Sequence, residues 1–116
     1  MALTTIGITA TEVSSGTQNG TVLYSSTGGS NAITSVIACN NSIADISITL
    51  YAVPSGKTAF VNPECTFVSG LLIPAGDTVS FDQEKLVLGN GDKLCGIATT
   101  GYTGTGVSVV VSTLAV

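Results

Sequence analysis

The sequence predicts an all-β fold, an antiparallel β-sandwich or jelly roll of about eight short strands. Apolar and polar residues alternate with a period of two through most of the chain, most clearly between Ile46 and Val53. This period is typical of a strand with one buried face. Clusters of Gly, Pro, Asn and Ser recur at short intervals and divide the alternating stretches. Helical periodicity is not sustained anywhere, and the many β-branched residues favour strands.

In the first half of the chain, three clusters of turn-forming residues separate four alternating stretches. The clusters are Ser15–Gly20, Thr27–Asn31 and Asn40–Ser42, whose Gly, Asn and Ser residues accept the backbone conformations that turns need. Two of them contain N-glycosylation patterns, at Asn19 and Asn40, which we interpret as turns. The strands predicted in this half are residues 4–11, 21–26, 32–40 and 44–53.

The second half begins with a longer connection, which Pro54–Lys57 opens and which runs to about Glu64. Pro74–Asp77 predicts a β-turn, because Pro fixes φ and Gly accepts positive φ. Gly89–Asp92 predicts a hairpin, and residues 82–88 fit a helical turn or a short strand. The strands predicted in this half are residues 65–73, 77–82, 93–99 and 106–115.

A chain of 116 residues is expected to form one domain, which here spans residues 1–116. Residues 1–20 are expected to form an arm or an edge strand that contacts a neighbour. Phe67 and Phe81 lie within apolar alternation and are expected in the core. The N-terminal segment MALTTIGITATEV has neither the basic region nor the apolar run of a secretory signal, so we expect folding in the cytoplasm.

Charged side chains are scarce. Three Lys and Arg residues and seven Asp and Glu residues make up 9% of the chain, whereas about 25% is usual. A low-charge surface favours association, so we expect an obligate assembly that hides part of the surface. A solvated Ser/Thr surface on a monomer is the alternative. Lys57, Lys85 and Lys93 are scattered, which argues against binding to nucleic acid or to an anionic membrane.

Residue types that commonly support catalysis and zinc binding are also scarce. Histidine is absent, and no pair of cysteines has the spacing of a zinc site. Cys39, Cys65 and Cys95 are widely separated and have no obvious activating partner in the sequence. We interpret them as small core residues of a protein folded in a reducing compartment, with a disulfide as the alternative. We therefore expect neither an enzyme nor a cofactor.

The sequence contains residues suited to two further kinds of site. Asp82, Glu84, Asn90 and Asp92 could supply oxygen ligands to Ca²⁺, and the first two could form a catalytic carboxylate pair. The favoured interpretation is a hairpin turn beside a solvated edge, so no metal is expected. A sugar site would need an exposed aromatic ring, for which Tyr102 in a Gly-rich loop is the best candidate. Tyr102 equally fits an anchor at a protein interface.

Five residues are predicted to contact partners: Tyr51, Phe60, Tyr102, Val110 and Leu114. Tyr51, Val110 and Leu114 belong to the outward faces of strands 44–53 and 106–115. Val110 and Leu114 are apolar where a polar residue is expected, and exposed apolar patches are typical of contact sites. Phe60 lies in the long connection, which is apolar on both sides.

Six motifs follow one another in the chain: TVLY at 21–24, CN at 39–40, ITLYAVPSG at 48–56, IPAGDTVSF at 73–81, LVLGNGDKL at 86–94 and VSVVVS at 107–112. Together they resemble a family of small tailed-phage virion proteins that are frequent in environmental and cyanobacterial phages. The resemblance rests on the order of the motifs, since each alone is a common turn pattern. Gly56–Glu64 departs from it, so we expect this loop to be specialised for a partner.

The resemblance implies a jelly-roll or sandwich protein that decorates heads, cements capsomers or builds tail and baseplate parts. We expect a capsid decoration protein that is assembled in the host cytoplasm and resides in the virion. It would form a homo-oligomer, a trimer by the resemblance, and contact the major capsid protein or tail proteins. The alternatives are a tail, collar or baseplate component and a carbohydrate-binding module for host adsorption. A bacterial surface or pilus subunit is disfavoured because no signal peptide is recognised.

Overall fold

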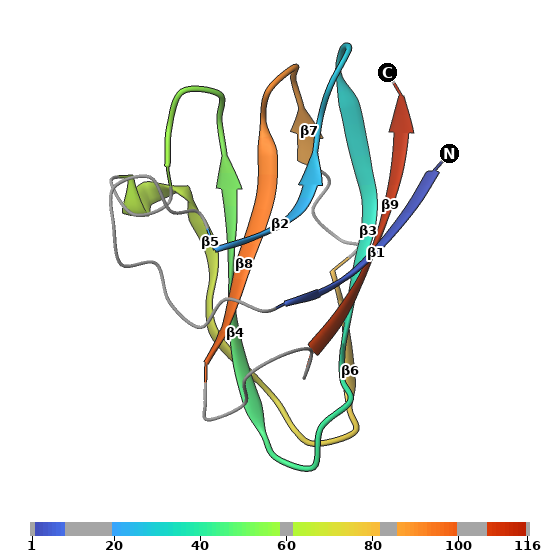
Figure 1. The fold of residues 1–116 in the computed structure, drawn as a ribbon, viewed down its shortest axis with the longest axis vertical. Helices are drawn as coiled ribbons and strands as arrows, with labels where there is room; N and C mark the ends of the chain where they lie inside the picture. The colour runs from blue at the N-terminus through green and yellow to red at the C-terminus, as the bar shows by residue number, and fades with distance from the viewer. Residues whose placement is uncertain (1, 9–19, 59–61, 82–85, 100–106, 116) are drawn as a thin grey trace.

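Two antiparallel β-sheets pack face to face and account for nearly all of the regular structure (Figure 1). The computed structural model describes residues 2–8, 20–58, 62–81, 86–99 and 107–115. Within these ranges there are nine strands, one short 3-10 helix and no α-helix. The all-β sandwich predicted from the sequence is confirmed. No helix in the described ranges is long and apolar enough to cross a membrane.

The five-stranded sheet, here called sheet A, has the order β1-β9-β3-β6, with β7 paired to β3 beyond the end of β6. The four-stranded sheet, sheet B, has the order β2-β8-β4-β5. The strands of sheet A are β1 (Ala2–Ile8), β3 (Asn31–Asn40), β6 (Thr78–Phe81), β7 (Leu86–Leu88) and β9 (Val107–Ala115). Those of sheet B are β2 (Thr21–Ser25), β4 (Ile46–Val53), β5 (Thr66–Ile73) and β8 (Lys93–Thr99).

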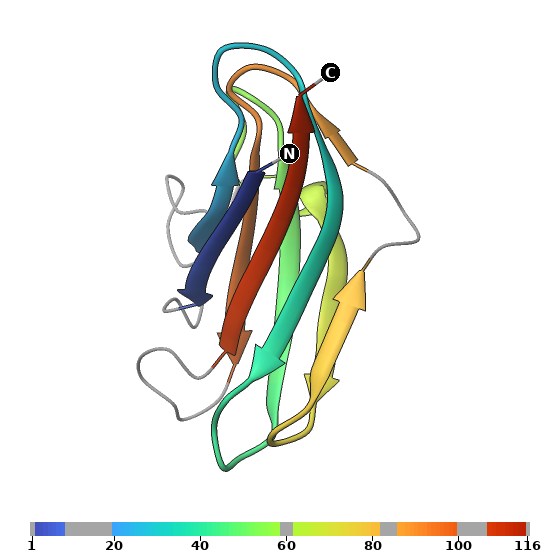
Figure 2. The same cartoon turned by 90° about the vertical axis from the view of Figure 1, so that its right-hand side faces the viewer.

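The chain crosses repeatedly between the two sheets, so that β1, β3 and β9 lie in sheet A while β2, β4 and β8 lie in sheet B. The first strand pairs with the last along the whole length of β1, from Ala2 opposite Thr113 to Ile8 opposite Val107. This connectivity is that of a jelly roll. The start of β1 and the end of β9 therefore lie close together at one edge of sheet A (Figure 2).

The predicted strand positions agree with the structure to within about two residues, except at the first strand. The first strand occupies 2–8, where 4–11 is predicted, and it is an edge strand of sheet A. Residues 86–88 form β7, the short strand that was one of two interpretations of that stretch. The 3-10 helix η1 (Pro63–Cys65) was not predicted.

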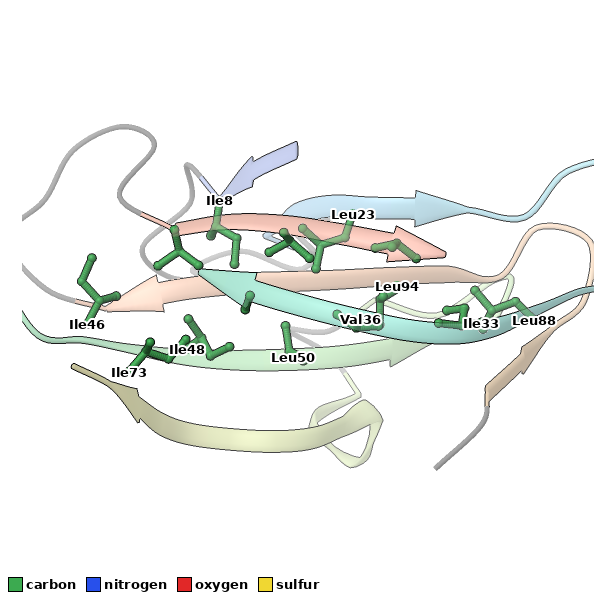
Figure 3. Close-up of a cluster of buried hydrophobic side chains, with 14 residues drawn as sticks. Ile8, Leu23, Ile33, Val36, Ile46, Ile48, Leu50, Ile73, Leu88 and Leu94 are labelled. Carbon is green, nitrogen blue, oxygen red and sulfur yellow. The ribbon is translucent and has the colours of Figure 1, made fainter. Parts of the chain in front are cut away.

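Alternate residues of both sheets fill the space between them (Figure 3). In β4, Ile46, Ile48 and Leu50 are each at most 1% exposed, and they belong to the same core cluster as Val107, Val109 and Val111 of β9 in the other sheet. Burying each such side chain contributes about 1.5–3 kcal/mol. The period of two in the sequence thus produces the core directly.

A second apolar cluster lies on the other side of sheet B. It contains Tyr51, Val53, Cys65, Cys95 and Ile97. Leu94 belongs to the core between the sheets, so its neighbour Cys95 points to the opposite face. The helix η1 contacts β4 there and contributes Cys65, which covers this part of the outer face. Sheet B is therefore apolar on both sides around Tyr51 and Cys95.

The pairing of β5 with β4 contains two irregularities, and these correct the prediction for Phe67. Two steps along β4 from Ile48 to Leu50 match three steps along β5 from Leu71 to Val68, so β5 carries an extra residue there. The extra residue shifts the alternation along β5, which places Val68 against the core and its neighbour Phe67 on the outer side. Phe67 is 42% exposed, so its assignment to the core was wrong, whereas Phe81 does pack against the core.

Candidate functional site

No other described element lies over the outer face of sheet A (Figure 2). We call it the uncharged face. Residues placed opposite one another in the strand register share a face, and the burial pattern assigns their inward neighbours to the core. The uncharged face consists of Leu3, Thr5, Gly7, Ala32, Ser35, Ile37, Cys39, Thr78, Ser80, Val87, Ser108, Val110, Ser112 and Leu114.

The strand register orders these side chains into rows that cross the sheet. One row runs from Thr5 through Val110 and Ile37 to Ser80. At one end of the sheet, Ala32 is opposite both Leu114 and Val87. At the other end, Cys39 is opposite both Ser108 and Thr78. The face is therefore graded, with aliphatic residues at one end and small and hydroxyl residues at the other.

The aliphatic end is well exposed. Leu3 is 69% exposed, Val87 is 63% exposed and Leu114 is 46% exposed. Ile37, nearer the middle, is 38% exposed. Single exposed aliphatic residues are ordinary on protein surfaces, but several on one face of one sheet are typical of a contact surface.

Charged residues lie elsewhere in the described parts of the chain. Asp45, Asp77 and Asp92 are in turns or connections, Lys57 and Glu64 are in the β4–β5 connection, and Lys93 begins β8 of sheet B. None of these six belongs to a strand of sheet A. Lys57 and Glu64 form an ion pair at 3.8 Å, which contributes little because both side chains are exposed.

Two of the predicted contact residues, Val110 and Leu114, lie on the uncharged face. Tyr51 points outward from β4, as its alternation predicts, but it belongs to the second apolar cluster and is only 8% exposed. Its apolar surface is thus used within the chain. Phe60 and Tyr102 lie outside the described residues, and their contacts stay predictions.

Sequence reasoning missed Leu3, Ile37 and Val87 as members of this face. The signal for Ile37 was present, since Val36 and Ile37 are adjacent apolar residues and only one can point inward. Val36 is the buried one, at 4% exposure. Leu3 could not be placed because the first strand begins earlier than the alternation indicates.

Asn90 and Asp92, two of the four residues considered for calcium binding, have structural roles in the described part of the chain. Asp92 Oδ1 accepts a hydrogen bond from the Ser55 backbone N–H at 2.9 Å, and Oδ2 accepts one from the Gly89 N–H at 2.8 Å. Asn90 Oδ1 accepts one from the Gly28 N–H at 2.9 Å. These bonds join three loops at one end of the sandwich. The described residues contain no group of three or more potential metal ligands.

The three cysteines are free thiols with different surroundings. Cys65 and Cys95 are buried, as predicted, and burial raises the pKa of Cys95 to about 11, which keeps its thiol protonated at neutral pH. Cys39 is only partly buried and lies on the uncharged face. Its assignment to the core was therefore wrong, because residues 36, 38 and 40 supply the inward side chains of β3.

A shallow hollow of about 270 Å³ opens beside β1 and is lined by Thr5, Ile6, Gly7 and Ser108. Three of these residues belong to the uncharged face. None of the four is aromatic, so the hollow lacks a ring on which a sugar could stack. Neither protein-family profiles nor curated proteins nor solved structures give a match to this chain.

Proposed function

We propose that this protein is a non-enzymatic structural protein of a tailed-phage virion, and specifically a head decoration or cement protein. The observation that carries the proposal is the uncharged face, whose described residues include no charged side chain and which exposes Leu3, Val87 and Leu114. Such a surface is suited to burial against another protein. The phage assignment is supported by the resemblance of the six ordered motifs to virion proteins.

In this role the protein binds the assembled head and adds buried interface to it. A specific interface needs about 1,000 Å² or more of buried surface. A ligand that binds only the assembled state stabilises that state by mass action. Cys95 and Asp92, two candidates for chemistry, are engaged in packing and in loop hydrogen bonds, which supports a structural role over a catalytic one.

The test uses the phage that encodes this chain, with the gene deleted. Heads that lack the protein should release DNA at a lower temperature than wild-type heads, and adding the purified protein should restore the difference. Equal rupture temperatures with and without saturating protein would contradict the cement role.

The location of the protein in purified virions separates the proposal from its alternatives. Mass spectrometry of separated heads and tails should find the chain in the head fraction. Detection only in tails would replace the proposal with the tail, collar or baseplate role. A glycan-array signal that Tyr102→Ala abolishes would favour the carbohydrate-binding module for host adsorption, in whichever virion fraction the chain is found.

A further inference from the structure

We propose that the uncharged face is an interface between two copies of this chain, which pack sheet A against sheet A about a two-fold axis. The proposal rests on the assembly role proposed above and names the occupant of the face. The resulting dimer would be a stack of four sheets in the order B, A, A, B. A two-fold interface is self-complementary, because each copy contributes the same residues.

The size of the face is sufficient for such a dimer. The two central strands, β3 and β9, have ten and nine residues, so they are about 30 Å long at about 3.3 Å per residue. Four strand positions at a spacing of about 4.8 Å give a width of about 19 Å. Two copies would therefore bury about 1,100 Å² in projection, just above the roughly 1,000 Å² that a specific interface requires.

The charge distribution favours a second copy over other partners. Each chain has a net charge of −4, so two copies repel each other at long range, and a contact surface free of charge adds no close like-charge pairs to that repulsion. The six described charged residues all lie outside the strands of sheet A. Nucleic acid and anionic membranes are bound chiefly through lysine and arginine, which the strands of this sheet lack. A neutral face is complementary to another neutral face.

The gradient along the face selects one orientation of the two copies. A two-fold axis parallel to the strands places the aliphatic end of one copy on the aliphatic end of the other. It also places β1 of each copy over β7 of its partner, so Leu3 approaches Val87 of the partner. An axis perpendicular to the strands would instead place these exposed aliphatic side chains against Ser and Thr. Sheets that pack face to face keep their strands within about 30° of each other, which the parallel axis permits.

The first experiment is sedimentation equilibrium of the full chain and of two variants. Ile37→Glu places a carboxylate in the middle of the uncharged face, whereas Leu72→Glu is a matched control on the outer face of β5. Leu72 is 53% exposed and opposite Ser47 in sheet B. Wild type and Leu72→Glu should be dimers or even multiples of the chain. Ile37→Glu should halve that mass and weaken association by at least about 100-fold, because an unpaired carboxylate would be buried.

Two substitutions that introduce opposite charges test the relative orientation of the two copies. They also provide a test that does not depend on whether Ile37→Glu folds. Leu3→Glu and Val87→Lys each replace a highly exposed side chain, so both should fold, as circular dichroism and the unfolding midpoint can show. Each alone should weaken the dimer. The double variant should regain at least about ten-fold of the lost affinity, because the two charges meet across the interface. No regain would overturn the parallel orientation.

The proposal is overturned if the wild-type chain is a monomer at tens of micromolar concentration, or a trimer. It is also overturned if Ile37→Glu keeps the wild-type mass while remaining folded. These outcomes are independent of the virion assays. A monomer found in purified heads would defeat the dimer and leave the decoration role intact, whereas a dimer absent from virions would do the reverse.

Discussion

Asn40, at the end of β3, is a fully buried polar residue whose side chain is completely satisfied. Its Nδ2 donates to the carbonyl oxygens of Ala44 and Ile73, both at 2.8 Å. Its Oδ1 accepts from the N–H and the hydroxyl of Ser42. The sequence predicted a turn here, and the structure explains it as a link between the β3–β4 connection and the end of β5. A glycan on Asn40 would be incompatible with this fold.

Replacing Asn40 with Ala should lower the free energy of unfolding by about 2 kcal/mol, because the Ile73 carbonyl loses a buried hydrogen bond and the Ala44 carbonyl loses a partly buried one. Asn41→Ala is the matched control, since Asn41 is exposed and bonds mainly to Ser108. It should cost less than about 1 kcal/mol. Guanidinium unfolding of both variants measures the difference. Equal losses of unfolding free energy in the two variants would show that the hydrogen bonds of Asn40 stabilise the fold no more than those of the exposed Asn41.

Gly96 on β8 is required by close packing. A Cβ at this position would lie 2.9 Å from Leu50 Cδ2, 3.3 Å from the Thr49 carbonyl oxygen and 3.4 Å from Leu23 Cδ1. We expect Gly96→Ala to destabilise the fold by about 1–3 kcal/mol, as overpacked cores usually are. Gly89→Ala, whose Cβ would meet only Asp92 Oδ2 at 3.4 Å, should be nearly neutral. Thermal unfolding of the two variants compares them, and an unchanged midpoint for Gly96→Ala would contradict the packing argument.

At the scale of elements, strand positions could be predicted because turn residues and alternation are local signals. Strand β5 was predicted at 65–73 and lies at 66–73. The direction of Phe67 could not be predicted, because the bulge that turns it outward depends on pairing with β4. Tyr51 shares its cluster with Cys65 of η1, the next element after β4, which the intervening connection brings back onto the outer face of β4. Local patterns do not contain such contacts.

The second apolar cluster predicts a pH dependence of stability. Burial raises the pKa of Cys95 from its ordinary value of 9.0 to about 11 and also raises the pKa of Tyr51. Between these two values the folded thiol keeps its proton and the unfolded thiol loses it. The unfolded chain then binds fewer protons, so the free energy of unfolding should fall as the pH rises from 9.0 to about 11. Guanidinium unfolding across this range measures the slope.

Cys95→Ala should reduce the change of unfolding free energy with pH. Part of the change should remain, because the raised pKa of Tyr51 also contributes to it. The comparison uses the slope with pH and not the absolute stability, because the substitution also removes packing from a fully buried site. A slope identical to that of the wild type would mean that Cys95 is not the titrating group.

At the scale of the molecule, the described strands of sheet A carry no charged residue. The sequence shows that charge is scarce, but it does not show that these strands share one sheet, since that depends on which strands pair. Strands β1 and β9 come from opposite ends of the chain, and β3 joins them from the middle. The predicted contacts Val110 and Leu114 could be found from alternation on one strand. Their neighbours Ile37 and Val87 required the sheet order.

Self-association through this face should be insensitive to salt or strengthened by it. Each copy carries a net charge of −4, and salt screens the repulsion between copies, while an uncharged interface has no ion pairs to lose. Sedimentation at increasing sodium chloride concentration measures the association constant. A steep decrease with salt would indicate an ionic interface located elsewhere on the molecule.

The central claim is that the outer face of sheet A is buried by a second copy, and the reactivity of Cys39 tests it most directly. Cys39 lies on this face, whereas Cys65 and Cys95 are buried in the single chain. The rate at which a maleimide modifies native Cys39 should therefore fall as the protein concentration rises and the dimer forms. In Ile37→Glu the rate should stay high at every concentration. A constant rate in the wild type, across concentrations at which its mass doubles, would contradict the claim.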